Sequence, residues 1–134
     1  MESEGNPLAH CILRGYADDR HITRPNSQYD TLKQLSDLYS ESGVLNPAAI
    51  VDCNHSNSNK QPQEQPRIAK DVLHSMSLNG GINSMVKGLM IESYLIGGCQ
   101  SETGSVFGQS ITDPCLGWDE SEKLIYEIAD LLKK

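Results

Sequence analysis

Three short apolar segments set the strongest limit on the fold of this chain. They are residues 10–16 (HCILRGY), 48–56 (AAIVDCNHS) and 87–95 (KGLMIESYL). Each segment is mostly apolar, without regular alternation, and each ends in polar or ionisable residues. Parallel strands that are covered on both faces show this near-continuous apolar character. The three segments therefore predict strands of a parallel sheet.

Amphipathic segments separate and follow these predicted strands. Apolar residues at helical spacing predict helices over residues 29–43, 62–76 and 119–134. The order β-α-β-α-β-loop-α predicts right-handed βαβ units and an α/β fold. The final loop, residues 97–118, is rich in Gly and Ser and is longer than a simple connection requires. Long loops in compact domains often carry function, so we expect this loop to contribute to a site.

Length and charge exclude several classes of protein. At 134 residues the chain has the size of one domain, and its net charge of −7, with 11 scattered basic residues, argues against a nucleic-acid-binding surface. It has no apolar run long enough to span a membrane, and its first residues are acidic, unlike a signal peptide. We therefore expect a soluble cytoplasmic protein. The four cysteines form no CxxC pair, which argues against a structural zinc site. Because the sequence shows no secretion signal, we expect the four thiols to be reduced.

Ionisable side chains occur where each predicted strand ends. Alternation along the strands predicts that Arg14, His55 and Glu92 each end one face of a strand, at the carboxyl edge of the sheet. Parallel α/β folds bind ligands at that edge. Each residue also has a structural interpretation: the arginine as a salt-bridge partner, the histidine as a hydrogen-bonded support, and the glutamate as a helix cap.

A mixed set of nitrogen and oxygen donors accompanies these strand ends. His55, Glu92 and Asp113, the last in the long loop, suit a divalent cation such as Mn²⁺, Fe²⁺, Co²⁺ or Zn²⁺. Their separations match no short metal-binding motif. The hypothesis of a metal site therefore rests on the shared position at one edge of the sheet.

Four stretches of the sequence carry a family resemblance. GNPLAHCILRGY, IVDCNHSNSNKQ, GLMIESYLIGGCQS and GQSITDPCLGW closely resemble consecutive stretches of the class I, metal-dependent 3-deoxy-D-arabino-heptulosonate 7-phosphate (DAHP) synthases, also called phospho-2-dehydro-3-deoxyheptonate aldolases. The resemblance implies a (β/α)₈ TIM barrel. Residues 1–134 would form a single partial domain, the C-terminal segment of that barrel, with about three βα units corresponding to strands six to eight.

The resemblance also implies roles for individual residues. Arg14 would bind the phosphoenolpyruvate anion, and His55, Glu92 and Asp113 would be three of four metal ligands. His55 also suits a proton relay near neutral pH. The fourth ligand, a cysteine in a "GPCS"-type motif, is missing from this sequence.

Three further residues near His55 have less specific roles. Asn57 and Lys60 are candidates for substrate contacts beside the anion site. Cys53 stands where the family normally has an aromatic residue, and it is either a packing residue or a substitute thiolate ligand.

The activity implied by the resemblance is a metal-dependent, aldol-type condensation. Phosphoenolpyruvate and erythrose 4-phosphate would give DAHP and phosphate, the first step of the shikimate pathway of aromatic amino acid biosynthesis. The family's "KPRT"-type loop, which the resemblance implies binds erythrose 4-phosphate, is also absent. The missing ligand and loop predict that this chain alone is inactive without an N-terminal part. The alternative is a catalytically inactive fragment or relic that acts as a metal-binding or oligomerising subunit.

A partial barrel would leave apolar side chains and sheet edges uncovered. We expect Ile12, Val51 and Met90 to face the barrel interior and therefore to be exposed to water in this chain. The chain is predicted to form a homo-oligomer or to pair with a separate N-terminal polypeptide, which would bury that face.

Overall fold

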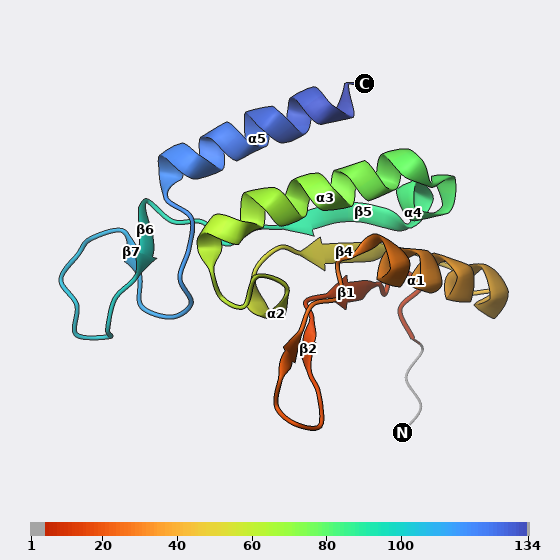
Figure 1. Ribbon diagram of the computed structural model, residues 1–134, viewed down its shortest axis with the longest axis horizontal. Coiled ribbons are helices and arrows are strands. Elements are labelled where there is room, and N and C mark those ends of the chain that lie inside the picture. Colours follow the sequence, from red (N-terminus) through yellow and green to blue (C-terminus); the bar gives the residue numbers. More distant parts are fainter. Residues whose placement is uncertain (1–4, 134) are drawn as a thin grey trace.

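A three-stranded parallel sheet lies at the centre of the protein. The computed structural model describes residues 5–133. Strands β1 (Cys11–Leu13), β4 (Ala49–Asp52) and β5 (Val86–Met90) are ordered β1-β4-β5, and both pairings are parallel. Their arrows point to the same side of the molecule, where α2 and the β6–β7 segment lie (Figure 1). The predicted parallel strands are confirmed, although each is shorter than the apolar segment that predicted it.

Helices follow the strands in the predicted order. The three expected helices are α1 (Tyr29–Ser42), α3 (Gln65–Leu78) and α5 (Trp118–Leu132). Two short helices were not predicted: α2 (His55–Ser58) and α4 (Gly80–Met85). The first residues of the helix predicted over 62–76 form a separate 3₁₀ turn, η1 (Pro62–Glu64). Within the described residues, no helix has the length and apolar character needed to cross a membrane.

The helices cover one face of the sheet. A buried cluster joins side chains of all three strands to Leu32 of α1, Ile68 and Val72 of α3, and Leu124 of α5. Leu13, Ala49 and Val51 supply the strand side of this cluster, and Val51 is fully buried. The core therefore lies between the sheet and its helices.

The opposite face of the sheet is less well covered. Ile12 pairs in register with Ile50, which in turn pairs with Gly88, and Ile12 is 45% exposed. Val51 instead pairs with Leu13 and Leu89 on the buried face. The prediction that Val51 shares the uncovered face with Ile12 is therefore wrong. It placed Val51 on the face of His55 by strand alternation, but β4 ends at Asp52 and His55 lies outside it.

Two small sheets extend from the strand ends. The antiparallel pair β2 (Tyr16–Ala17) and β3 (Thr23–Arg24) follows β1, and the parallel pair β6 (Ile96–Cys99) and β7 (Gln109–Ser110) lies within the long loop region after β5. Figure 1 shows both projecting from the body of the molecule. They flank the edge of the sheet where the predicted site residues lie.

Candidate metal centre

His55 lies beyond the end of β4 rather than in the strand. The strand ends at Asp52, and His55 is the first residue of α2, with a φ of 42°. This left-handed conformation is uncommon for a residue other than glycine, and such conformations cluster at functional sites. The interpretation of His55 as part of an alternating strand is therefore wrong. A turn, not strand alternation, brings the imidazole to the carboxyl edge of the sheet.

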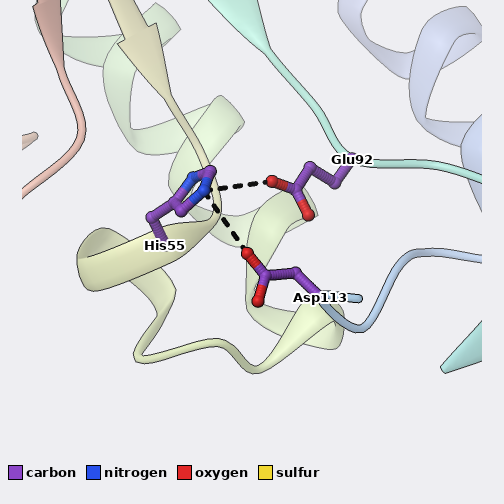
Figure 2. Close-up of side chains that lie close together, drawn as sticks. All are labelled: His55, Glu92 and Asp113. Carbon is purple, nitrogen blue, oxygen red and sulfur yellow. Dashed lines mark ion pairs between the residues drawn. The ribbon is translucent and has the colours of Figure 1, made fainter. Parts of the chain in front are cut away.

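Two carboxylates meet the imidazole of His55. Its Nε2 lies 3.3 Å from Oε1 of Glu92 and 3.5 Å from Oδ2 of Asp113 (Figure 2). The three donor atoms lie within 4.8 Å of one another. The side chains are 20% to 30% exposed, so the cluster is reachable from solvent but partly shielded.

This donor set fits a divalent cation. Imidazole nitrogen and carboxylate oxygen bind first-row cations at about 2.0–2.2 Å, which places neighbouring ligand atoms roughly 3 Å apart. The separations from Nε2 to the two carboxylates are close to that value. The residues present would therefore hold a cation with three protein ligands and leave further coordination positions open.

Backbone pairing anchors the loop that carries Asp113. The N–H of Leu116 donates to the carbonyl of Glu92 at 3.0 Å, and the N–H of Tyr94 donates to the carbonyl of Leu116 at 2.9 Å. Cys115 and Gly98 exchange a further pair of backbone hydrogen bonds of 3.1 and 2.8 Å. The loop is thus fixed against the segment that follows β5, and Asp113 is held next to Glu92. The expectation that the long loop contributes to a site agrees with this placement.

Three buried polar residues support the cluster, and sequence reasoning did not identify them. Oδ2 of Asp52 lies 2.6 Å from Nδ1 of His55, and Nδ2 of Asn54 donates to Oε2 of Glu92 at 2.9 Å. Gln65 forms two hydrogen bonds with the backbone of Glu92, one from its Nε2 to the carbonyl and one from the N–H to its Oε1. The signal available in the sequence was DCNH, where an acid and an amide directly precede the histidine at the end of a buried strand.

Two cationic side chains lie beside the cluster. Arg14 and Lys60 line a cavity of about 290 Å³ together with His55 and Asp113. Nζ of Lys60 donates to Oδ1 of Asp113 at 2.7 Å. This hydrogen bond lowers the pKa of Asp113 and raises the pKa of Lys60. The charge of Arg14 also lowers the pKa of Asp113, so the cavity brings the carboxylates of the cluster next to two positively charged side chains.

Asn57 has a structural environment. Its side chain is buried, and Nδ2 donates to the carbonyls of Leu13 and Asp52 at 3.0 and 2.8 Å. Its Oδ1 accepts from the N–H of Asn26 at 2.7 Å. Both amide hydrogens of Asn57 are therefore bonded within the protein. The Asn57 side chain links the ends of β1 and β4 to Asn26 and is not among the residues that line the cavity.

Cys53 belongs to the core rather than to the metal cluster. It is fully buried among the apolar residues, and its N–H donates to the carbonyl of Met90 at 2.8 Å. Burial, and secondarily the charge of Asp52, raises the pKa of the Cys53 thiol to about 12. A thiol that stays protonated makes a poor ligand. Cys53 is not among the donors that converge at His55, Glu92 and Asp113, and its place in the core cluster supports the packing interpretation.

Known proteins resemble this chain in both sequence and structure. The sequence profile of the DAHP synthetase I family matches residues 1–125. The Trp-sensitive phospho-2-dehydro-3-deoxyheptonate aldolase of Escherichia coli is 35% identical over 131 residues, covering 96% of this chain and 35% of the relative. The phospho-2-dehydro-3-deoxyheptonate aldolase of Haemophilus influenzae is 32% identical over 133 residues, covering 97% of this chain and 34% of the relative.

A solved structure shows the same fold over nearly the whole chain. The phospho-2-dehydro-3-deoxyheptonate aldolase of Francisella tularensis superposes with a TM-score of 0.83 at 27% identity, covering 98% of this chain and 36% of that chain. The chain therefore spans about a third of the length of the relatives that it matches. By the extent of the profile match and the agreement in fold, the chain belongs to the DAHP synthetase I family.

Proposed function

We propose that this chain supplies the metal-binding part of a DAHP synthase active site. In this proposal the strands β1, β4 and β5 correspond to strands six to eight of a (β/α)₈ barrel. His55, Glu92 and Asp113 would hold a divalent cation, and Arg14 with Lys60 would bind a substrate anion. The reaction would be the condensation of phosphoenolpyruvate with erythrose 4-phosphate.

One observation carries the proposal: donors from three separate segments meet at one edge of the sheet, next to two cations. The imidazole comes from α2, one carboxylate from the segment just after β5 and the other from the long loop, and their ligand atoms lie within 4.8 Å of one another. Arg14 and Lys60 line the adjoining cavity. A site that binds a metal cation next to a pocket for an anion suits a metal-assisted reaction of phosphorylated substrates.

In this proposal, the cation and the side chains of this chain have different roles in the reaction. When bound, the cation would supply Lewis-acid polarisation of the aldehyde oxygen or orient water. The guanidinium of Arg14 offers paired donors that match a phosphate or carboxylate, and Lys60 adds a single positive charge. In the balanced reaction, C3 of phosphoenolpyruvate forms a bond to the aldehyde carbon, water adds to C2, and the C2–O bond breaks to release phosphate.

Residues beyond this chain would complete the site. The chain spans 35% of the Escherichia coli relative, and the described residues bring together three donors that could hold a metal ion. The resemblance implies a cysteine as the fourth ligand and further groups for both substrates. We therefore expect catalysis only when this chain is joined by the remaining part of the barrel.

The exposure of one sheet face favours a second candidate function. Ile12 is 45% exposed on the face opposite the helices, at an edge strand of the sheet. A protein that associates through this face could be a metal-binding or oligomerising subunit without catalytic activity.

Cation binding and complementation test the two candidates. The 134-residue chain is titrated with Mn²⁺ by calorimetry, and His55→Ala is compared with His74→Ala, which removes an exposed imidazole from α3. We expect loss of binding only in His55→Ala. Phosphate release from phosphoenolpyruvate and erythrose 4-phosphate is then measured with and without a polypeptide that carries the remaining part of a relative. Activity only in the mixture supports the enzyme, binding without activity supports the subunit, and equal Mn²⁺ binding by both variants contradicts the metal centre.

A further inference from the structure

We propose that Asp52 is a positioning residue that fixes the tautomer and orientation of His55, so that Nε2 is presented unprotonated to the cation. The proposal rests on the proposed function because it assigns Nε2 as the ligand atom. It adds a residue that lies outside the three-residue cluster and that contacts no cation itself.

Both oxygens of the Asp52 carboxylate have a defined partner. Oδ2 lies 2.6 Å from Nδ1 of His55, and Oδ1 accepts from the N–H of Asn54 at 2.8 Å. The side chain of Asp52 is 2% exposed. A carboxylate buried to this degree and bonded at both oxygens has one orientation, which makes it a rigid reference for the imidazole.

The distances assign the hydrogen of the neutral His55 ring to Nδ1, because Oδ2 of Asp52 lies 2.6 Å from Nδ1, whereas the carboxylates of Glu92 and Asp113 lie 3.3 and 3.5 Å from Nε2. A carboxylate oxygen accepts hydrogen bonds, so Nδ1 must donate, and in a neutral imidazole Nε2 then keeps its lone pair. Nε2 is the atom that lies 3.3 Å from Glu92 and 3.5 Å from Asp113. The lone pair therefore points to the place where the two carboxylate oxygens also converge (Figure 2). Carboxylates that orient metal-binding histidines in this way contribute to metal affinity.

The backbone around His55 supports the same arrangement. The left-handed φ of 42° at His55 is held by two hydrogen bonds, from the N–H of Ser56 to the carbonyl of Arg14 at 3.1 Å and from the N–H of Lys60 to the carbonyl of His55 at 2.9 Å. The carbonyl of Asp52 accepts from Nδ2 of Asn57 at 2.8 Å. Because both backbones are fixed, the Asp52 side chain acts on the ring rather than on the path of the chain.

Substitution of Asp52 by asparagine tests the tautomer directly. The N–H of Asn54 requires an acceptor, so the amide oxygen of the new side chain is expected to take the place of Oδ1. Its NH₂ group then faces Nδ1 of His55 and acts as a donor. The imidazole would respond by carrying its hydrogen on Nε2, which blocks the ligand atom. The side chain keeps its size, so the fold is expected to persist.

The experiment compares the whole 134-residue chain with Asp52→Asn and with Asp71→Asn, which removes an exposed carboxylate from α3. Each protein is titrated with Co²⁺ alone, and the visible absorption of the bound ion gives both affinity and coordination. We expect Asp52→Asn to bind Co²⁺ about 10- to 100-fold more weakly, with an altered spectrum, and Asp71→Asn to match the parent chain. Equal affinity and spectrum in Asp52→Asn would overturn the proposal.

A second measurement separates this inference from the proposed metal centre. The ¹⁵N shifts of His55 in the metal-free chain at alkaline pH report which ring nitrogen is protonated. We expect the hydrogen on Nδ1 in the parent chain and on Nε2 in Asp52→Asn. That result supports the positioning role even if no Co²⁺ binds, in which case the proposed function alone fails. A parent chain with the hydrogen on Nε2 overturns the inference, and this outcome requires no variant to fold.

Discussion

Lys60 and Asp113 form an ion pair of 2.7 Å although 53 residues separate them in the sequence. Lys60 follows α2, and Asp113 belongs to the long loop after β5. The pair lies at the border between the metal-binding cluster and the cavity lined by Arg14 and Lys60. The carboxylate of Asp113 is therefore positioned between Lys60 and the proposed cation. The ammonium group of Lys60 therefore repels a bound cation and attracts a bound anion.

Substitution of Lys60 by methionine is predicted to strengthen cation binding and to weaken anion binding. A positive charge next to a ligand carboxylate repels a divalent cation, so removing it is expected to raise the affinity for the cation by a small factor. We expect tighter Mn²⁺ binding and weaker binding of inorganic phosphate, both by calorimetry. Lys33→Met, which removes the 2.6 Å pair with Asp37 on α1, is the control. Weaker Mn²⁺ binding by Lys60→Met would contradict the placement of the cation beside Asp113.

Gln65 is predicted to be a major source of local stability. It is fully buried, and its amide satisfies both the N–H and the carbonyl of Glu92 at 2.8 and 3.1 Å. Substitution by leucine would leave the N–H of Glu92 without a partner and would remove one of the two hydrogen bonds to its carbonyl, which also accepts from the N–H of Leu116. Such a loss costs about 1–3 kcal/mol. We expect that loss in the free energy of unfolding measured with urea. Gln63→Leu changes an exposed neighbour and is expected to lie within about 0.5 kcal/mol of the parent chain. A similar small change in Gln65→Leu would show that the amide contacts are dispensable.

Much of the fold and the location of the site could be predicted from local sequence. Continuous apolar segments specified three parallel strands, and helical spacing specified α1, α3 and α5, because these patterns reflect burial within one element. The carboxyl ends of parallel strands share one edge, so the prediction that Arg14, His55 and Glu92 lie together depended on topology and not on the detailed course of each strand. For that reason, the predicted location of these three residues did not depend on the incorrect strand alternation at His55.

The supporting contacts depend on distant segments and could not be predicted in the same way. Gln65 and Glu92 are 27 residues apart, and Asn54 is 38 residues from Glu92. The register of β4 against β1, which places Val51 in the core, is likewise a property of two strands together. No periodicity within one segment encodes such pairs, so these features appear only once the segments are packed.

Gly15 is predicted to tolerate no side chain. Its φ is 73°, and an added Cβ would lie 2.5 Å from Cβ of Ser56 and 2.8 Å from the carbonyl oxygen of Arg24. Alanine at this position would therefore push Arg14 and α2 apart. Gly43→Ala is a matched control, because Gly43 has a φ of 64° but no atom within 4 Å of the added Cβ. Both variants carry the left-handed backbone cost of about 1–2 kcal/mol, and Gly15→Ala is expected to lose about 1–3 kcal/mol more through overpacking. Equal losses in urea denaturation would show that the loop moves freely.

Cys53 is predicted to resist alkylation in the folded protein. Burial raises the pKa of its thiol from 9.0 to about 12, whereas Cys99 is exposed. At neutral pH, iodoacetamide followed by mass spectrometry is expected to show modification of Cys99 and protection of Cys53, which is lost in urea. Because the folded state keeps the proton above pH 9.0 and the unfolded state releases it, this thiol contributes stability that falls as the pH rises from about 9 to about 12. Rapid labelling of Cys53 without denaturant would contradict its place in the core.

Ile12 is predicted to drive association of the 134-residue chain. Its side chain is 45% exposed on the sheet face opposite the helices, and β1 is an outer strand of the sheet. An uncovered apolar face beside a strand edge favours pairing with another polypeptide, and a charge in that face opposes it. We expect the parent chain to self-associate in light-scattering measurements and Ile12→Asp to weaken that association by at least about tenfold. Leu38→Asp places the same charge at a 62% exposed position on α1 and should leave the association unchanged. A parent chain that stays monomeric and cooperatively folded would refute the prediction, because the open face would then be stable in water.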